Sequence, residues 1–231
     1  SVKHHLTYRV ELFEKPIEII FAIENVSITN KLLEKYNNYF EWMLVWLYIA
    51  YQYSSKKCFT TLRVVIYHLT LEKKMPHVHT DILGQNHVNT AFTYSCPTQS
   101  PEIIIYRQEE WFKVFIHETF HTLGLDFSNM NTDDCAAKMR KIFSVKTEVN
   151  LYESYCETWA RIINALFCSY IYRKSPTIHH FMENSRYFIH MEQMFSLFQM
   201  VKVLSHMNLS YTDLYSTSSL KKSYKEDSNI L

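Results

Sequence analysis

Apolar residues recur along the chain with two different periods, which separate strands from helices. Strands are predicted, in chain order, over residues 8–13, 17–23, 62–71, 88–95 and 102–106. Helices are predicted over residues 29–53, 108–124, 132–143, 147–172 and 182–206. We therefore expect one α+β domain, 1–231, with a sheet-bearing lobe over 1–124 and a helical lobe over 125–231.

Single residues refine the ends and faces of these helices. Thr29 is the expected N-cap of the first helix, and Gly124 is expected to end the second. Glu109 and Glu110 are expected in the first turn of that second helix, where the helix dipole favours anions. A helical stripe near the C-terminus is interpreted as core, with members Met191, Met194, Phe195, Phe198 and Val201.

Composition narrows the class of protein. The chain has 231 residues, of which 47% are hydrophobic, and this suffices for one sizeable core. Its net charge of +1 gives no reason to expect a nucleic-acid partner. The longest apolar run, residues 42–51, is too short to span a bilayer, so no membrane partner is expected either.

The cysteines bear on the compartment. The chain has five, Cys58, Cys96, Cys135, Cys156 and Cys168, and none of them forms a C-x-x-C pair. The odd number and wide spacing favour reduced thiols and a cytoplasmic, reducing compartment over a disulfide framework.

One helical segment carries chemistry. In Phe115–Phe127 (FIHETFHTLGLDF), His117, Glu118 and His121 form the pattern H-E-x-x-H. Positions four apart share one helix face, so both imidazoles can bind one ion while Glu118 reaches a water beside it. Roughly one shuffled chain in twenty of this composition would contain the pattern by chance, so the residues around it have to support a metal site. Two histidines and a glutamate on a buried helix need partners, which favours a real site over a chance pattern.

With these residues the chain resembles the zincin metallopeptidases. In the metzincin subgroup the motif continues as H-E-x-x-H-x-x-G-x-x-H, and Gly124 matches its glycine. Phe127 stands where the third histidine would be, and Asp126 lies one residue too early. This departure argues against a metzincin.

In the gluzincin subgroup, a glutamate from a later helix is the third zinc ligand. Residues 152–167 (YESYCETWARIINALF) carry Glu153 and Glu157 four apart, on one helical face. The stretch ETWA resembles the E-x-x-A element of gluzincin ligand helices, where small Ala160 would let two helices approach. The resemblance implies Glu157 as the third ligand and Glu153 as the runner-up. The glutamate that does not bind could orient a ligand histidine.

The resemblance covers residues 88–167 and implies a fold order of edge strand, short strand, H-E-x-x-H helix and glutamate helix. The phrases EEWFKVFIHETFH and YESYCETWARIIN are similar to uncharacterised metallopeptidase-like proteins of large nucleocytoplasmic DNA viruses. The low glycine content, with Gly at 2 positions, agrees with an AT-rich viral or protist genome. Because the chain opens with Ser1, we expect a processed or partial product.

The activity that the resemblance implies is peptide-bond hydrolysis, with His117, His121 and Glu157 on Zn²⁺. Zinc lowers the pKa of a bound water toward about 7, and Glu118 as general base passes its proton to the leaving amine. The substrate would be a peptide or protein. The resemblance implies that the strand over 88–95 pairs with it, and the alternative is an ordinary strand of the sheet without this role. Gluzincins use a Tyr or His as a second electrophile, and the candidates here are Tyr152, Tyr155, His179, His180, His190 and Tyr211.

Two other interpretations stay open. The chain could be a catalytically inactive zincin-fold structural or virion protein with a structural metal, or a metal-free helical interaction module. A structural site has no use for a base at Glu118 and tends to fill all four metal positions with protein ligands. A second histidine cluster, His77, His79 and His87, is a weaker metal candidate on a loop that contains Pro76.

Overall fold

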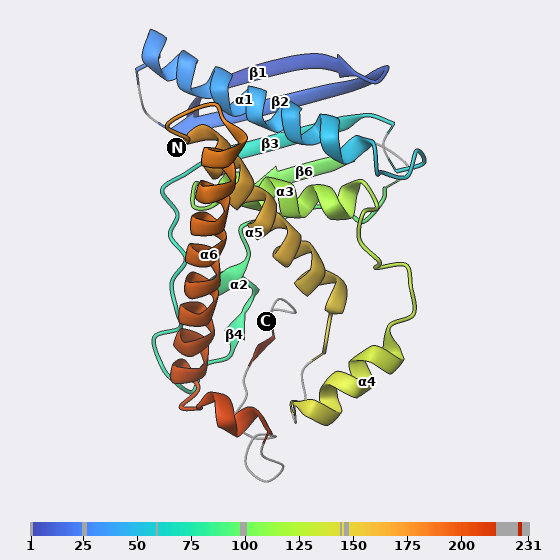
Figure 1. Cartoon of the computed structure of the whole chain (residues 1–231), viewed down its shortest axis with the longest axis vertical. Coiled ribbons are helices and arrows are strands. Elements are labelled where there is room, and N and C mark those ends of the chain that lie inside the picture. The colour runs from blue at the N-terminus through green and yellow to red at the C-terminus, as the bar shows by residue number, and fades with distance from the viewer. Residues whose placement is uncertain are drawn as a thin grey trace. The chain divides into compact units, whose positions relative to one another are not determined.

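The computed structural model describes residues 2–24, 27–58, 60–97, 101–143, 145, 148–215 and 226–227 (Figure 1). It contains helices and a mixed sheet, which confirms the predicted α+β class. The chain divides into two compact units, of which unit 1 comprises Ser1–Glu72 and Thr90–Ser128, and unit 2 comprises Lys73–Asn89 and Asn129–Leu231. Among the described residues, no helix combines the length and apolarity needed to cross a membrane.

Unit 1 is built on a five-stranded sheet with the order β1-β2-β3-β6-β5. Its strands are β1 (Val2–Leu12), β2 (Lys15–Glu24), β3 (Leu62–His68), β5 (Ala91–Phe92) and β6 (Glu102–Ile105). Strand β3 runs parallel to both β2 and β6. Strand β1 is antiparallel to β2, and β5 is antiparallel to β6, so an antiparallel strand forms each edge.

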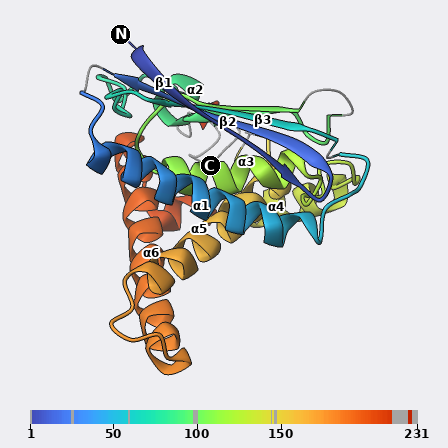
Figure 2. The ribbon, with the colours of Figure 1, turned by 90° about the horizontal axis from the view of Figure 1, so that it is seen from above.

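Helices α1 (Asn30–Tyr51) and α3 (Trp111–Thr122) lie on the same side of this sheet (Figure 2). Fully buried residues align across the central strands, as in the row Ile19, Val64 and Ile103. The period-2 alternation of β2 and β3 thus forms the core that the helices cover. As predicted, Thr29 caps α1, and its hydroxyl accepts a hydrogen bond from the amide of Leu32.

A two-residue turn joins β1 to β2, because Leu12 pairs with Lys15. Both turn residues, Phe13 and Glu14, have positive φ angles, of 53° and 60°. Two positive φ angles are typical of a type I′ hairpin turn, which favours Asn-Gly. The ring of Phe13 stacks on Tyr48 and Tyr51 of α1, and this packing offsets part of the cost of its positive φ angle.

We expect Glu14→Gly to raise the free energy of unfolding by about 1 kcal/mol, because glycine adopts positive φ without the steric cost paid by glutamate. Urea denaturation measures this change. The matched control is Glu11→Gly in β1, which should lower the free energy of unfolding. Equal effects of the two substitutions would contradict the assignment of strain to the turn.

Unit 2 contains the remaining elements. These are β4 (Leu83–Gly84), α2 (Gln85–Val88), α4 (Asp133–Ile142), α5 (Leu151–Ile171), α6 (Ile178–His206), the 3₁₀ turn η1 (Tyr211–Tyr215) and β7 (Glu226–Asp227). Arg161 of α5 donates hydrogen bonds to Glu192 and Ser196 of α6 and so ties the two long helices together.

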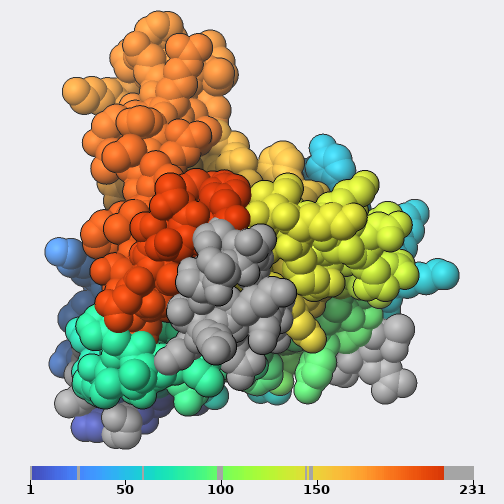
Figure 3. All heavy atoms as spheres, turned by 90° about the horizontal axis from the view of Figure 1, so that it is seen from below, coloured from blue at the N-terminus to red at the C-terminus, as the bar shows by residue number. Residues whose placement is uncertain are grey.

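The interpretation of the stripe on α6 as core is wrong. Figure 3 shows α6, orange to red, contributing side chains to the surface. The exposed fractions of the predicted core residues run from 38% for Phe195 to 61% for Phe198, with Met191, Met194 and Val201 in between. Apolar residues occur around much of this helix, so a helical period alone did not identify its buried face.

Two local predictions near the motif also need correction. Helix α3 begins at Trp111, and Glu110 is its N-cap in a left-handed conformation, with φ of 55°. Glu109 and Glu110 therefore precede the first turn instead of lying in it. Of the strand predicted over residues 88–95, only Ala91–Phe92 is observed: Val88 belongs to α2, and only these two residues pair with β6. Helix α5 begins at Leu151, and Thr147, its expected start, lies outside the described residues.

The prediction of five reduced thiols is wrong for two of them. Cys58 and Cys96 form a disulfide, while Cys135, Cys156 and Cys168 are free. The bonded pair is 38 residues apart in the sequence. Its partners meet because the segment after α1 and the segment after β5 both reach the C-terminal end of α3, which no spacing rule anticipates. The inference of a reducing compartment loses the support that it took from the cysteines.

Candidate metal centre

Helix α3 carries all three residues of the H-E-x-x-H motif. The helix follows the inner strand β6 after a short connection and is buried along most of its length, with Phe115 and Ile116 fully inaccessible. Trp46 of α1 donates a hydrogen bond of 2.7 Å to the Thr119 hydroxyl, which fixes the rotation of α3 against its neighbour. The motif therefore sits on a rigid element.

The two imidazoles of the motif converge. The Nε2 atoms of His117 and His121 are 3.2 Å apart, and their ring centroids are 5.0 Å apart. Two nitrogens that each lie 2.0–2.1 Å from one tetrahedral zinc are about 3.3 Å apart. The spacing of this pair therefore fits two ligands of a single ion.

Asp126 fixes which nitrogen of His121 is available. Its Oδ2 lies 2.6 Å from His121 Nδ1, and its side chain is completely buried. An ionised carboxylate only accepts hydrogen bonds, so Nδ1 carries the proton and Nε2 of the neutral ring presents a lone pair toward His117. A carboxylate behind a ligand histidine is a recurrent feature of zinc sites, where it orients the ring and raises its basicity.

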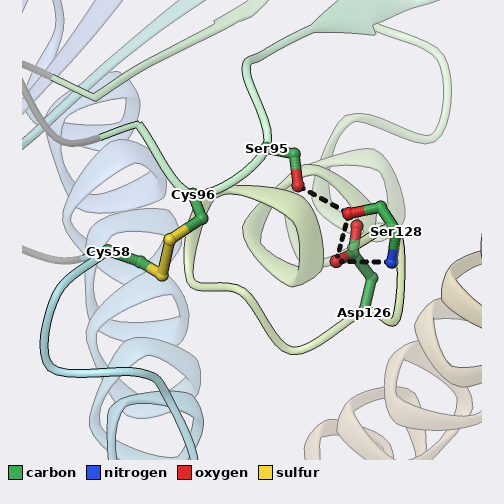
Figure 4. Close-up of a disulfide and its surroundings, with 5 residues drawn as sticks. All are labelled: Cys58, Ser95, Cys96, Asp126 and Ser128. Carbon is green, nitrogen blue, oxygen red and sulfur yellow. Dashed lines mark hydrogen bonds between the residues drawn. A yellow bond between two sulfur atoms is a disulfide. The ribbon is translucent and has the colours of Figure 1, made fainter. Parts of the chain in front are cut away.

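Hydrogen bonds keep Asp126 ionised. Burial raises the pKa of Asp126, but hydrogen bonds from His121 and Ser128 outweigh it, so its pKa is lowered overall. The Ser128 hydroxyl donates to Asp126 Oδ1 over 2.8 Å. Because this proton is used, the Ser95 hydroxyl must donate the hydrogen bond of 2.8 Å that joins it to Ser128 (Figure 4).

Glu118 lies on the same helix and is 9% exposed. The pKa of Tyr106 reveals one of its neighbours: burial raises that pKa, Arg107 lowers it and the Glu118 carboxylate raises it. Tyr106 directly follows β6, and the charge of the Glu118 carboxylate acts on the pKa of its phenol.

The end of α3 is a Schellman motif. The amide of Leu125 donates to the carbonyl of Phe120 over 2.8 Å, and the amide of Gly124 donates to that of His121 over 3.0 Å. Gly124 has φ of +63°, as its predicted role as the helix stop requires. The turn reverses the chain, which brings Asp126 back to His121. The site thus depends on the glycine as well as on the motif.

Unit 1 supplies two candidate ligands. Among its described residues, no third His, Cys, Asp or Glu joins His117 and His121 in a group able to hold a metal ion. Asp126, which was one residue early for a metzincin ligand, instead binds the far nitrogen of His121.

The two predicted glutamates lie one turn apart on α5 of unit 2. Glu157 Oε1 accepts a hydrogen bond of 2.8 Å from Arg161 Nε, which fixes its side chain. Glu153 lies in the first turn of the helix. A hydrogen bond of this kind is common for ligand carboxylates and for carboxylates that only support a ligand. Glu157 as third ligand and Glu153 as runner-up therefore both stay predictions.

The second histidine cluster has other partners. His79 Nδ1 contacts the carbonyl of His206 at 2.9 Å, and His87 Nδ1 accepts a hydrogen bond from the amide of Gly84. In the part of the chain that the structure describes, no metal group includes His77, His79 or His87. The second electrophile expected from Tyr152, Tyr155, His179, His180, His190 or Tyr211 also stays a prediction. A comparison of the chain with known protein families, with curated proteins and with solved structures finds no match.

Proposed function

We propose that this chain is a zinc-dependent metallopeptidase of the gluzincin type. The observation that carries the proposal is the convergence of His117 and His121, with Nε2 atoms 3.2 Å apart and Asp126 on the far side of the second ring. Any buried histidine needs a hydrogen-bond partner, but the lone pairs of these two rings also converge at the spacing of two ligands of one ion, which a chance pair does not require. The chain order of the edge strand β5, the inner strand β6 and the motif helix, within an α+β fold, supports the zincin comparison.

The residues present fit zinc and hydrolysis. Imidazole nitrogens and a carboxylate suit Zn²⁺, and three protein ligands leave one position open. When bound, the ion would supply a nucleophilic water at neutral pH and polarise a carbonyl oxygen. His117 and His121 would hold it, and Asp126 would keep the His121 ring oriented.

Glu118 would move the proton. It follows the first ligand histidine, and in the H-E-x-x-H pattern its carboxylate would reach a water beside the ion without being a ligand itself. It would accept a proton from the attacking water and return it to the amine that leaves the cleaved peptide. Its low exposure strengthens this role, because a partly desolvated carboxylate is a better base.

We propose a peptide or protein as the substrate. Strand β5 forms an edge of the sheet beside α3, and Thr93, just after it, contacts Thr122 of α3 through hydroxyls 2.9 Å apart. An extended peptide can add to such an edge through main-chain hydrogen bonds. Phe92 and Tyr94, which are 51% and 71% exposed, would contact its side chains.

The test is zinc content by elemental mass spectrometry on purified protein. We expect about one zinc per chain in the wild type and in Glu118→Gln, and almost none in His121→Ala, because three-ligand zinc sites rarely survive the loss of one ligand. Glu157→Gln and Glu153→Gln identify the third ligand, since only the true ligand should lower the zinc content. His79→Ala is the matched histidine control and should keep the zinc.

Two outcomes would redirect the proposal. A wild type without zinc after reconstitution would make the motif a chance pattern in a helical interaction module. Zinc retained by both glutamate variants, together with no hydrolysis of any peptide library, would favour the inactive structural or virion protein.

The cytoplasmic location expected from the sequence stays a proposal, and the disulfide makes the redox state of that compartment relevant to the site.

A further inference from the structure

The Cys58–Cys96 disulfide packs against the C-terminal end of α3. A Cβ atom placed on Gly124 would lie 2.7 Å from Cys58 Sγ, so the disulfide and the helix-ending glycine are in direct contact. The segment that precedes Cys58 is tied to the same helix end, because the amide of Ser55 donates to the carbonyl of Leu123 over 3.3 Å. Figure 4 shows the disulfide beside this turn.

Cys96 also contacts the second ligand histidine through the main chain. Its amide donates a hydrogen bond of 2.9 Å to the carbonyl of His121, which accepts the amide of Gly124 as well. Cys96 has φ of 41°, a left-handed conformation that costs a non-glycine residue energy. The bond to Cys58 is one of the restraints on Cys96, so its loss removes a restraint on a backbone conformation that is already unfavourable.

A chain of hydrogen bonds continues from Cys96 to the His121 ring. Ser95, the preceding residue, binds Ser128 over 2.8 Å, and Ser128 binds Asp126 over 2.8 Å. Asp126 in turn holds His121 Nδ1 at 2.6 Å. The segment at the disulfide thus supports His121 twice, at its carbonyl through Cys96 and at its ring through Ser95.

We propose that the Cys58–Cys96 disulfide is a redox control of the metal centre: the bonded form holds His121 in its ligating geometry, and the reduced form releases it. The inference rests on the proposed zinc site. A change in the backbone at Ser95 and Cys96 alters both supports of His121 while leaving His117, one turn earlier, in place. The expected consequence is weaker zinc binding without unfolding of the sheet.

The reducing agent would be a dithiol. Cys96 is partly exposed while Cys58 is buried, so a thiolate of the dithiol attacks Cys96 Sγ. The bond between the two cysteine sulfurs breaks, and Cys58 leaves as a thiolate that takes up a proton. The second thiol of the dithiol then displaces Cys96, which takes up the second proton. Two electrons pass to the protein, and the dithiol becomes a disulfide.

The experiment compares zinc affinity in the two redox states by competition with a chromophoric chelator. The reduced sample is treated with a dithiol and desalted under inert gas, so that no reductant competes for zinc. We expect reduction to lower the affinity by 10- to 100-fold, the range usual for loss of the groups that support a metal ligand. The Cys58→Ser/Cys96→Ser variant should have the zinc affinity of the reduced wild type. Because this variant has no thiols at these positions, the comparison shows that the change in affinity does not come from new thiolate ligands.

Two variants control this comparison. Cys135→Ser removes an exposed free cysteine and should leave both affinities unchanged. Asp126→Asn should bind zinc more weakly than the wild type. The difference in its zinc affinity between the oxidised and reduced states should also be smaller, because the hydrogen bond from residue 126 to the His121 ring is already weakened. Equal zinc affinity of the oxidised and reduced wild type would overturn the proposal.

Hydrogen exchange on the metal-free protein separates this inference from the proposed function. Reduction should speed the exchange of the Cys96, Gly124 and Leu125 amides, which bond to the end of α3. The amides in the centre of β3 should keep their protection. If the oxidised protein binds no zinc, the proposed function fails, and faster exchange at the three amides would still support disulfide control of His121. Unchanged exchange there would overturn it.

Discussion

Glu118→Gln should abolish almost all peptide hydrolysis while leaving the zinc content unchanged. General acid–base catalysis contributes about 10²- to 10⁴-fold, so we expect kcat/KM to fall by about 10³-fold, or about 4 kcal/mol in the activation barrier. Glutamine has almost the same shape as glutamate, so the packing of α3 is preserved. The measurement is cleavage of a quenched fluorescent peptide library, with the best substrate used for kinetics.

The control for this prediction is an exposed carboxylate outside the motif. Glu109 precedes the same helix and lies outside the motif, so Glu109→Gln should retain the wild-type rate. Both proteins should hold equal zinc and unfold at the same temperature. A Glu118→Gln variant that hydrolyses peptides at the wild-type rate would refute its role as general base, whatever the zinc content.

The motif helix could be predicted from the sequence because two independent signals agree there. Apolar residues at helical spacing predict α3, which begins at Trp111 instead of residue 108, and Gly124 predicts its end, as observed. Positions 117 and 121 then have to share a face, so the convergence of the imidazoles follows from helix geometry alone. Local chemistry that is fixed within one helix is what a sequence specifies most directly.

Asp126 shows where such reasoning stops. From its spacing it was only a misplaced ligand, one residue short of the metzincin position. Its role at His121 Nδ1 depends on the chain reversal after Gly124, which brings a residue five positions on back beside the ring. Sequence spacing gives the number of residues between two positions. It does not give the direction of the chain after a turn, and so it does not predict which side chains lie next to each other there.

The disulfide and the edge strand depended on contacts that are distant in sequence. Cys58 and Cys96 meet only because α1, β5 and α3 bring their following segments together, and the odd cysteine count pointed away from a bond. Residues 88–95 alternate like a strand, but only Ala91 and Phe92 pair with β6. Alternation predicts a half-buried strand without saying how much of it finds a partner.

The buried core of unit 1 should make the protein sensitive to mild acid through His68. This residue is 6% exposed at the end of β3, among the rings of Phe21, Tyr39 and Trp111. The Tyr36 hydroxyl contacts its Nδ1 at 3.0 Å. In the described part of the chain, its Nε2 has no hydrogen-bond partner. A second proton on this ring would therefore be poorly accommodated.

Burial, together with the nearby charge of Lys35, lowers the pKa of His68 to about 4 from its ordinary value of 6.5. Above pH 6.5 the ring is neutral in both the folded and the unfolded chain, so it imposes no penalty. As the pH falls from 6.5 toward 4, His68 becomes protonated in the unfolded chain but stays neutral in the folded chain. The free energy of unfolding therefore decreases. The total loss is roughly 3 kcal/mol, at about 1.4 kcal/mol per pH unit.

Urea denaturation at a series of pH values measures this loss. His68→Gln, which keeps an acceptor for Tyr36, should be less stable than the wild type at pH 7.5. Its free energy of unfolding should nevertheless fall by about 3 kcal/mol less than that of the wild type between pH 6.5 and pH 4. The exposed His5, changed to Gln, is the matched control and should keep the wild-type slope. Parallel pH profiles of His68→Gln and the wild type would mean that His68 is protonated in the folded protein, so that the acid sensitivity arises at another residue.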